Sequence, residues 1–142
     1  MEVRCETTIN APQEVVWKIL RDADDWPKWN PVLHGLQGDI RPGGKGKLLA
    51  KVGNGPVLPI GIEFVQVEAP KELRWRGGIR GGMLGEHYFE LVPVGDGATR
   101  LIHGERFTGV LAKLVGPLLS GRLQSLYEQM NAELKRRAEA AA

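Results

Sequence analysis

The stretch from Glu86 to Gly109 constrains the fold most, because two runs of alternating polar and apolar residues meet there at Gly95-Asp96-Gly97. Alternation with a period of two is typical of strands that bury one face, and the glycine-rich turn between them predicts a β-hairpin. We expect a three-residue loop with Gly97 in the left-handed conformation. The resulting register pairs these positions on the buried face: His87 with Glu105, Phe89 with His103, and Leu91 with Leu101.

A two-residue Asp-Gly turn is the alternative, and it shifts the register by one residue so that Glu90 pairs with His103. Glu90 would then share a face with Leu101 and Phe107, where a carboxylate without a partner is unfavourable. The three-residue loop instead directs these side chains to solvent: Tyr88, Glu90, Arg100 and Arg106. An imidazole opposite a carboxylate among aromatic residues predicts the polar end of a mostly apolar pocket.

Length and composition limit the class of protein. A chain of 142 residues can bury one substantial core, so we expect a single domain over residues 1–142. The net charge of +2 is spread along the chain, which disfavours nucleic acid as the partner. The single cysteine, Cys5, cannot form an internal disulfide, and neither a signal-type run nor the roughly 18 to 20 apolar residues of a membrane span is present. These features predict a reduced, cytoplasmic protein.

The N-terminal third predicts a strand followed by two short helices. Residues 2–9 alternate as in a half-buried strand, with Cys5 on the apolar side. Asn10 is a candidate N-cap with Gln13 three residues later, which predicts a helix over residues 11–21. Residues 22–31, DADDWPKWNP, favour a short helical turn and a loop. Two tryptophans are expected to anchor that loop, Trp26 and Trp29.

Between Leu36 and Gly77 the breakers divide the chain into three or four short strands, which predicts an antiparallel meander. Alternation places the following side chains on the inner face: Leu48, Ala50, Val52, Ile60, Ile62, Phe64, Leu73 and Trp75. Gly77-Gly78 and Gly81-Gly82 are interpreted as a mobile link into the hairpin.

After Gly109 the apolar period changes to about 3.6, which predicts an amphipathic helix. Pro117 is expected to separate a short leading turn from a main helix that begins near Leu118. The inward side chains of this helix are predicted to be Leu119, Leu123, Leu126, Tyr127, Met130 and Leu134. A sheet with one apolar face needs a cover, and only this helix is long enough to provide it.

This layout and several short runs resemble the START and birch-pollen-allergen superfamily, in its bacterial polyketide cyclase/dehydrase-type branch. The runs are WPKWNP at 26–31, PGGKGKL at 42–48, GEHYFEL at 85–91, HGERFTG at 103–109 and MNAELK at 130–135. The resemblance implies an α+β helix-grip fold, in which a curved antiparallel sheet of six or seven strands wraps around a long C-terminal helix, with two short helices after the first strand. Many members enclose a cavity for lipids, steroids or polyketides, whereas function varies widely within the superfamily.

We therefore expect an apolar or aromatic small molecule to bind between the sheet and the C-terminal helix, with no cofactor. The predicted apolar wall consists of Trp75, Phe89, Leu101, Phe107, Tyr127 and Met130. His87, His103 and Glu105 would orient a polar group of the ligand, and Trp29 would lie at the cavity entrance. Two histidines and a carboxylate also suggest a metal site, but their cross-strand spacing fits no known ligand pattern. PGGKGK lacks the strand-to-helix context of a nucleotide-binding loop.

Two other functions remain open. One is a polyketide cyclase or dehydratase that uses His87 or Glu105 as the general base. The other is an interaction module of the co-chaperone type, which a filled interior and an exposed apolar patch would favour. The residues do not identify a protein partner.

Overall fold

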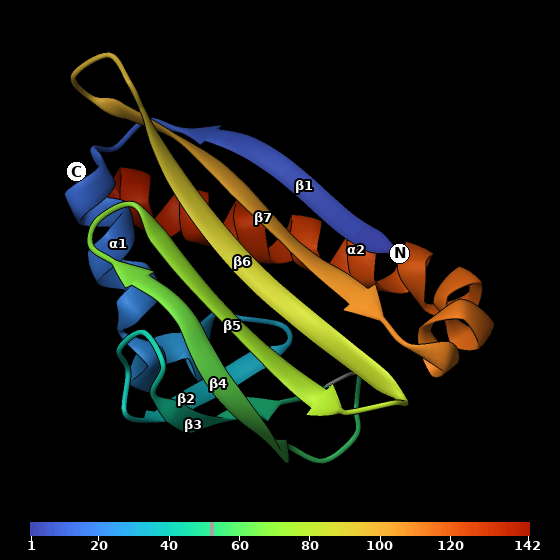
Figure 1. The fold of residues 1–142 in the computed structure, drawn as a ribbon. Helices are drawn as coiled ribbons and strands as arrows, with labels where there is room; N and C mark the ends of the chain where they lie inside the picture. Colours follow the sequence, from blue (N-terminus) through green and yellow to red (C-terminus); the bar gives the residue numbers. More distant parts are fainter. Residues whose placement is uncertain (52) are drawn as a thin grey trace.

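The computed structural model describes residues 1–51 and 53–142, which form seven strands, two α-helices and one 3-10 helix (Figure 1). In chain order these are β1 (Glu2–Ile9), α1 (Gln13–Arg21), η1 (Ala23–Lys28), β2 (Leu33–Gly38), β3 (Lys45–Ala50), β4 (Leu58–Glu68), β5 (Glu72–Ile79), β6 (Met83–Val94), β7 (Ala98–Thr108) and α2 (Val110–Ala141).

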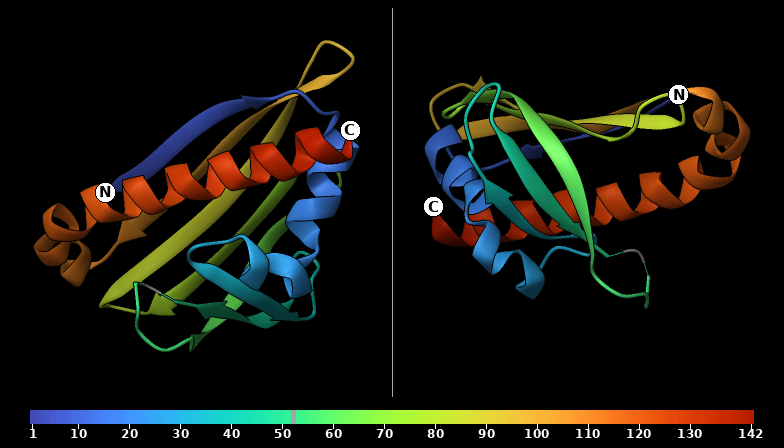
Figure 2. Two further views of the ribbon diagram at one scale, coloured as in Figure 1. Left: turned by 180° about the vertical axis from the view of Figure 1, so that it is seen from behind. Right: turned by 60° about the horizontal axis from the view of Figure 1, so that its bottom comes forward.

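The seven strands form one antiparallel sheet in the order β1-β7-β6-β5-β4-β3-β2. The sheet curves, and α2 crosses its concave face mainly over β1, β7 and β6 (Figure 2). At the other edge of the sheet, away from the strands that α2 covers, η1 packs on β2. This arrangement confirms the predicted helix-grip architecture, and it leaves the concave face of β4 and β5 further from the helix.

The β6–β7 hairpin has the register that the alternation predicts. His87 pairs with Glu105, and Phe89 pairs with His103. The left-handed glycine is Gly95, with a φ of 61°, and not Gly97 as expected. Glycine adopts this conformation without steric penalty at either position, so the residue types alone do not distinguish them.

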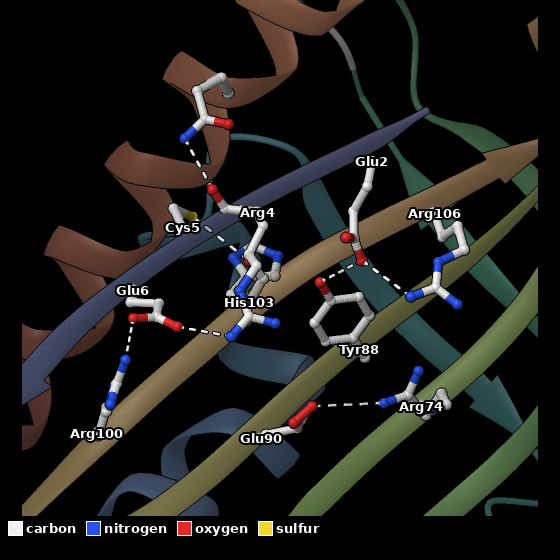
Figure 3. Close-up of polar contacts among 11 residues, drawn as sticks. Glu2, Arg4, Cys5, Glu6, Arg74, Tyr88, Glu90, Arg100, His103 and Arg106 are labelled. Carbon is white, nitrogen blue, oxygen red and sulfur yellow. Dashed lines mark hydrogen bonds and ion pairs between the residues drawn. The ribbon is translucent and has the colours of Figure 1, made fainter.

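Tyr88 points to the outer face of the sheet, yet it is only 3% exposed, which corrects the expectation that it faces solvent (Figure 3). Its ring lies across Gly104 on β7, where a Cβ atom would come within 2.5 Å of the tyrosine oxygen. The Arg74 guanidinium covers the ring at 4.8 Å from its centre, and the hydroxyl donates to Glu2 at 2.8 Å. Neighbouring charged side chains therefore shield the ring from water.

Helix α1 begins two residues later than the predicted range of 11–21, and Asn10 does not cap it. The backbone N–H of Asn10 donates instead to Glu139 of α2 at 2.8 Å. The Gln13 side chain, the expected partner in a capping box, donates to the Leu91 carbonyl at 2.7 Å. Tertiary contacts thus replace the local cap at this helix start.

The predicted meander is confirmed, because the structure has four strands between residues 33 and 79. Ile62, Phe64 and Trp75 are buried on their inner face. Val52, expected on the same face, lies outside the described residues. Ile60 is 37% exposed because it lies where the sheet is uncovered. Gly77 and Gly78 belong to β5 and pair with Gly85 and Leu84, so this half of the predicted glycine link is strand, whereas Gly81 and Gly82 form the β5–β6 turn.

Helix α2 runs unbroken from Val110 through Pro117, which corrects the expected separation of a leading turn. Its first turns lean away from the axis of the rest, as expected near a proline (Figure 2). Tyr127, Met130 and Leu134 are buried as predicted. Leu119 is 37% exposed, because the bent start of the helix carries it away from the sheet.

Candidate functional site

The concave face beneath the middle of α2 is filled by stacked rings. Trp75 stacks on His87 with ring centres 4.9 Å apart, and Phe89 stacks on His103 at 4.3 Å. Tyr127 of α2 stacks on the other side of His103 at 4.6 Å. The space that the sequence suggested as a central cavity is thus occupied by side chains here.

A chain of hydrogen bonds passes through this stack and begins at Cys5. The Cys5 thiol donates to the His103 carbonyl at 3.7 Å, a contact that Figure 3 marks. Because the thiol proton already forms that hydrogen bond, the sulfur acts as an acceptor and takes a hydrogen bond from the Asn131 Nδ2 group at 3.2 Å. The amide oxygen of Asn131 then faces His103 Nδ1 at 2.8 Å and accepts a hydrogen bond from its N–H group. The thiol therefore orients the amide, and the amide selects the Nδ1–H tautomer of His103.

The tautomer of His103 determines that of His87. With its proton on Nδ1, His103 offers a bare Nε2, which accepts from His87 Nε2–H at 2.7 Å. His87 Nδ1 faces Glu105 Oε1 at 3.5 Å, and the Tyr127 hydroxyl donates to the same oxygen. Glu105 therefore has Tyr127 and His87 as its polar neighbours.

Burial shifts the pKa values of several residues in this series of hydrogen bonds. The pKa of His103 lies well below its ordinary value, first because burial disfavours the charged ring and second because of the His87 charge. Burial and the neighbouring Glu105 raise the pKa of Tyr127 well above its ordinary range. Burial also raises the pKa of Cys5 to about 11, so this thiol is a hydrogen-bonding group and not a nucleophile.

The low pKa of His103 predicts a stability that decreases with acidity. The unfolded chain binds a proton at this histidine near its ordinary pKa of 6.5, whereas the folded protein does not. The unfolded state therefore gains protons first, and the free energy of unfolding should fall below pH 6.5 by up to about 1.4 kcal/mol per pH unit. Above pH 6.5 this contribution is constant. Urea unfolding between pH 5.5 and 7.5 measures the slope.

His103→Phe should flatten this slope, while His34→Gln, a change of a half-buried histidine on β2, should leave it in place. Equal slopes in His103→Phe and the parent protein would contradict the assignment of a neutral, buried His103.

An inner hollow of about 160 Å³ opens beside Glu105, at the uncovered end of the concave face. Its walls include Ile62, Trp75 and Phe107, and Gly77 and Gly85 lie next to each other in its floor. A Cβ atom on Gly85 would come within 2.3 Å of Glu105 Oε2, so a larger residue here would displace the carboxylate from its present position. The volume is close to that of an apolar cavity of about 150 Å³ that binds benzene.

The structure separates the predicted site residues into three groups. Trp75, Glu105 and Phe107 line the inner hollow. His87 and Tyr127 lie behind Glu105 and contact it. The others lie elsewhere: Phe89, Leu101, His103 and Met130 are packed in the core, and Trp29 lines a separate surface depression beside Gln129 and Glu133 of α2.

The sequence interpretation missed Asn131, Gly77 and Gly85. Asn131 follows Tyr127 by four residues and therefore lies on the buried stripe of α2, where a polar residue is unexpected. Gly85 occupies an inward position two residues before His87, so the absence of a side chain there was a readable sign of open space.

The described residues place two limits on the site. Residues 1–51 and 53–142 contain no group of three or more His, Cys, Asp or Glu side chains arranged to hold a metal ion. Within the same ranges, no helix combines the length and apolarity required to cross a bilayer.

Comparisons with known proteins agree with the fold. A START superfamily protein from Mycobacterium smegmatis is 18% identical, with 99% of each chain covered and a TM-score of 0.77. A Thermus thermophilus protein is 21% identical over 100% of this chain and 99% of its own, with a TM-score of 0.73. Norcoclaurine synthase from Thalictrum is 14% identical over 97% of this chain and 93% of its own, with a TM-score of 0.68.

Identities this low support a shared fold and not a shared activity. No curated protein is similar enough in sequence to count as a relative. The family model described as "Polyketide cyclase / dehydrase and lipid transport" matches residues 1–139, which is nearly the whole chain. The chain therefore belongs to the polyketide cyclase/dehydrase and lipid transport family, as its START-like helix-grip fold also indicates.

Proposed function

We propose that the inner hollow binds an apolar or aromatic small molecule and that Glu105 holds a hydrogen-bond donor of this ligand. The observation that carries the proposal is a carboxylate, only 18% exposed, in the wall of an otherwise apolar hollow. Its Oε1 is occupied by Tyr127, whereas Oε2 accepts no hydrogen bond from the described residues and lies over Gly85. An acceptor without a protein partner, in the apolar wall of a hollow, favours a ligand that supplies a donor.

The size of the inner hollow limits the ligand. A volume near 160 Å³ accommodates one aromatic ring or a short apolar segment. A larger ligand would bury that portion against Trp75 and Phe107 and extend past Ile60, which lies at the hollow's exposed side. Two further predicted residues, His87 and Tyr127, would act from behind the hollow, since they position Glu105.

Phenol and toluene test this proposal because they are similar in size and only phenol donates a hydrogen bond. A hydrogen bond to a charged group contributes about 1.5–3 kcal/mol, so wild-type protein should bind phenol about ten- to a hundredfold more tightly than toluene. Glu105→Gln should reduce this preference, because the amide lacks the charge. Calorimetric titration measures both affinities.

Glu63→Gln is a suitable control, because Glu63 is an exposed carboxylate on β4 outside the walls of the hollow. An equal phenol preference in Glu105→Gln and the parent protein would remove the role assigned to Glu105.

Acid–base catalysis is the second candidate function, and the geometry of His87 and Glu105 favours it. An imidazole and a carboxylate lie 3.5 Å apart at the wall of the hollow, and the imidazole of His103 continues behind them, an arrangement suited to passing a proton. A ligand with an acidic C–H or a hydroxyl group next to Glu105 Oε2 could exchange that proton. Turnover of a polyketide-like substrate that is abolished by both His87→Ala and Glu105→Gln would identify the protein as an enzyme; binding without turnover would identify a carrier.

A further inference from the structure

Large apolar side chains are exposed together at one end of the molecule. We call this surface the apolar rim and define it by Ile79, Val110, Leu111, Leu114 and Leu118, which are between 46% and 81% exposed. Ile79 and Leu111 both lie against Gly82, so the β5 end and the start of α2 share this surface. Single exposed apolar residues are ordinary, but a contiguous group of them in a folded protein marks a contact surface.

Two chain segments meet at the apolar rim. The backbone N–H of Leu111 at the start of α2 donates to the carbonyl of Gly82 in the β5–β6 turn at 3.0 Å. Further along α2, the Arg122 guanidinium extends to Gly53 of the β3–β4 connection, where a Cβ atom would come within 2.6 Å of it. Figure 1 shows the start of α2 beside the β5–β6 turn at the right of the molecule.

The start of α2 exposes its large apolar side chains, whereas the rest of the helix buries them. Its small residues, Ala112 and Gly116, are buried, whereas Leu114 and Leu118 are 68% and 81% exposed. Leu111, Leu114 and Leu118 follow a spacing of three and four, so they lie on one face of the helix. The core does not use this face, because the helix leans away from the sheet at this point (Figure 2).

Positively charged side chains without acidic neighbours in sequence lie on the same segments as these apolar side chains. The segments 53–61, 78–84 and 109–123 contain Arg80, Lys113 and Arg122 and no aspartate or glutamate. These cations are exposed, and within the described ranges none of the three forms an ion pair. On the outer face of the sheet, by contrast, Arg74 and Arg100 pair with carboxylates.

We propose that the apolar rim docks the protein on the surface of an anionic lipid bilayer. The leucines would enter the boundary between head groups and acyl chains, and the three cations would lie at the level of the phosphates. A second copy of this chain fits less well, because a two-fold contact through the rim would bring like charges together without a carboxylate between them. Docking here does not depend on the small-molecule proposal, although Ile60 beside the rim also lines the inner hollow.

Co-sedimentation with vesicles tests the docking proposal. We expect binding to vesicles of phosphatidylcholine mixed with phosphatidylglycerol, much weaker binding to phosphatidylcholine alone, and weaker binding as salt is raised. Lys113→Gln should weaken binding about fivefold, since each cation near the surface contributes about 1 kcal/mol. Leu114→Ser combined with Leu118→Ser should abolish binding, because it removes the exposed apolar face.

Val92→Ser combined with Val94→Ser is the matched control, since both valines are exposed beside the β6–β7 turn, at the other end of β6. All these side chains are exposed, so circular dichroism should show an unchanged fold. Failure of the parent protein to bind anionic vesicles at low salt would overturn the proposal, as would equal binding of the Leu114/Leu118 variant. A concentration-dependent dimer that the same two substitutions disperse, without vesicle binding, would assign the rim to a second copy instead.

Discussion

Replacing Trp75 by alanine is expected to lower the free energy of unfolding by about 3–5 kcal/mol, a large share of the roughly 5–15 kcal/mol that stabilises a typical domain. Trp75 is 2% exposed and lies at the centre of β5. It stacks on His87 and forms a wall of the inner hollow, so its removal opens a void and admits water to the imidazole. Denaturant unfolding monitored by circular dichroism measures the loss.

Trp75→Phe provides the matched comparison, because it keeps an aromatic ring against His87 while removing part of the volume. Its loss should be clearly smaller than that of Trp75→Ala. A loss below about 1 kcal/mol for Trp75→Ala would show that this ring is not packed as described, since buried aromatic truncations ordinarily cost about 3–5 kcal/mol.

Asn131→Leu is expected to produce the second large effect, because it leaves the His103 Nδ1–H group without an acceptor in a fully buried position. An orphaned buried donor costs about 1–3 kcal/mol. The same change should also allow both histidines to populate their other tautomers. Asn131 selects Nδ1–H in His103, and His103 in turn selects Nε2–H in His87. Nitrogen-15 NMR of the imidazole rings reads the tautomers, and denaturant unfolding reads the stability.

Gln129→Leu is the control for this experiment, because Gln129 is an exposed amide on the same helix. Stability and both tautomers should be unchanged in this variant. If Asn131→Leu also left the two histidine tautomers unchanged, the hydrogen-bond chain from Cys5 would not determine the protonation of the site.

The fold was predictable where a periodic pattern coincided with a clear turn signal. Alternation on both sides of Gly95-Asp96-Gly97 predicted the strand register, and the change of period after Gly109 predicted α2. Local signals failed where tertiary contacts replaced them. Asn10 has the residue type of a helix cap, but its backbone N–H is taken by Glu139, far away in the sequence. Tyr88 alternates outward, yet Gly104 and Arg74 bury it from neighbouring strands.

The candidate site was predictable only in part. The register brought His87 and Glu105 together as expected, because pairing across a hairpin follows from the sequence. The position of the inner hollow did not follow, since it depends on Gly77 and Gly85 lying side by side on two strands and on α2 leaning away from them. Asn131 could not be connected to His103 because the path of α2 over the sheet is a three-dimensional property.

A crystal structure of the protein soaked with phenol tests the binding site most directly. We expect the ring in the inner hollow, packed between Trp75 and Phe107, with its hydroxyl oxygen within hydrogen-bond distance of Glu105 Oε2. The Gly85→Ala variant should leave the hollow unoccupied, because the added methyl displaces the carboxylate. A saturated soak of the parent protein in which the hollow stays unoccupied, or in which phenol occupies only other surfaces, would contradict a ligand site at Glu105.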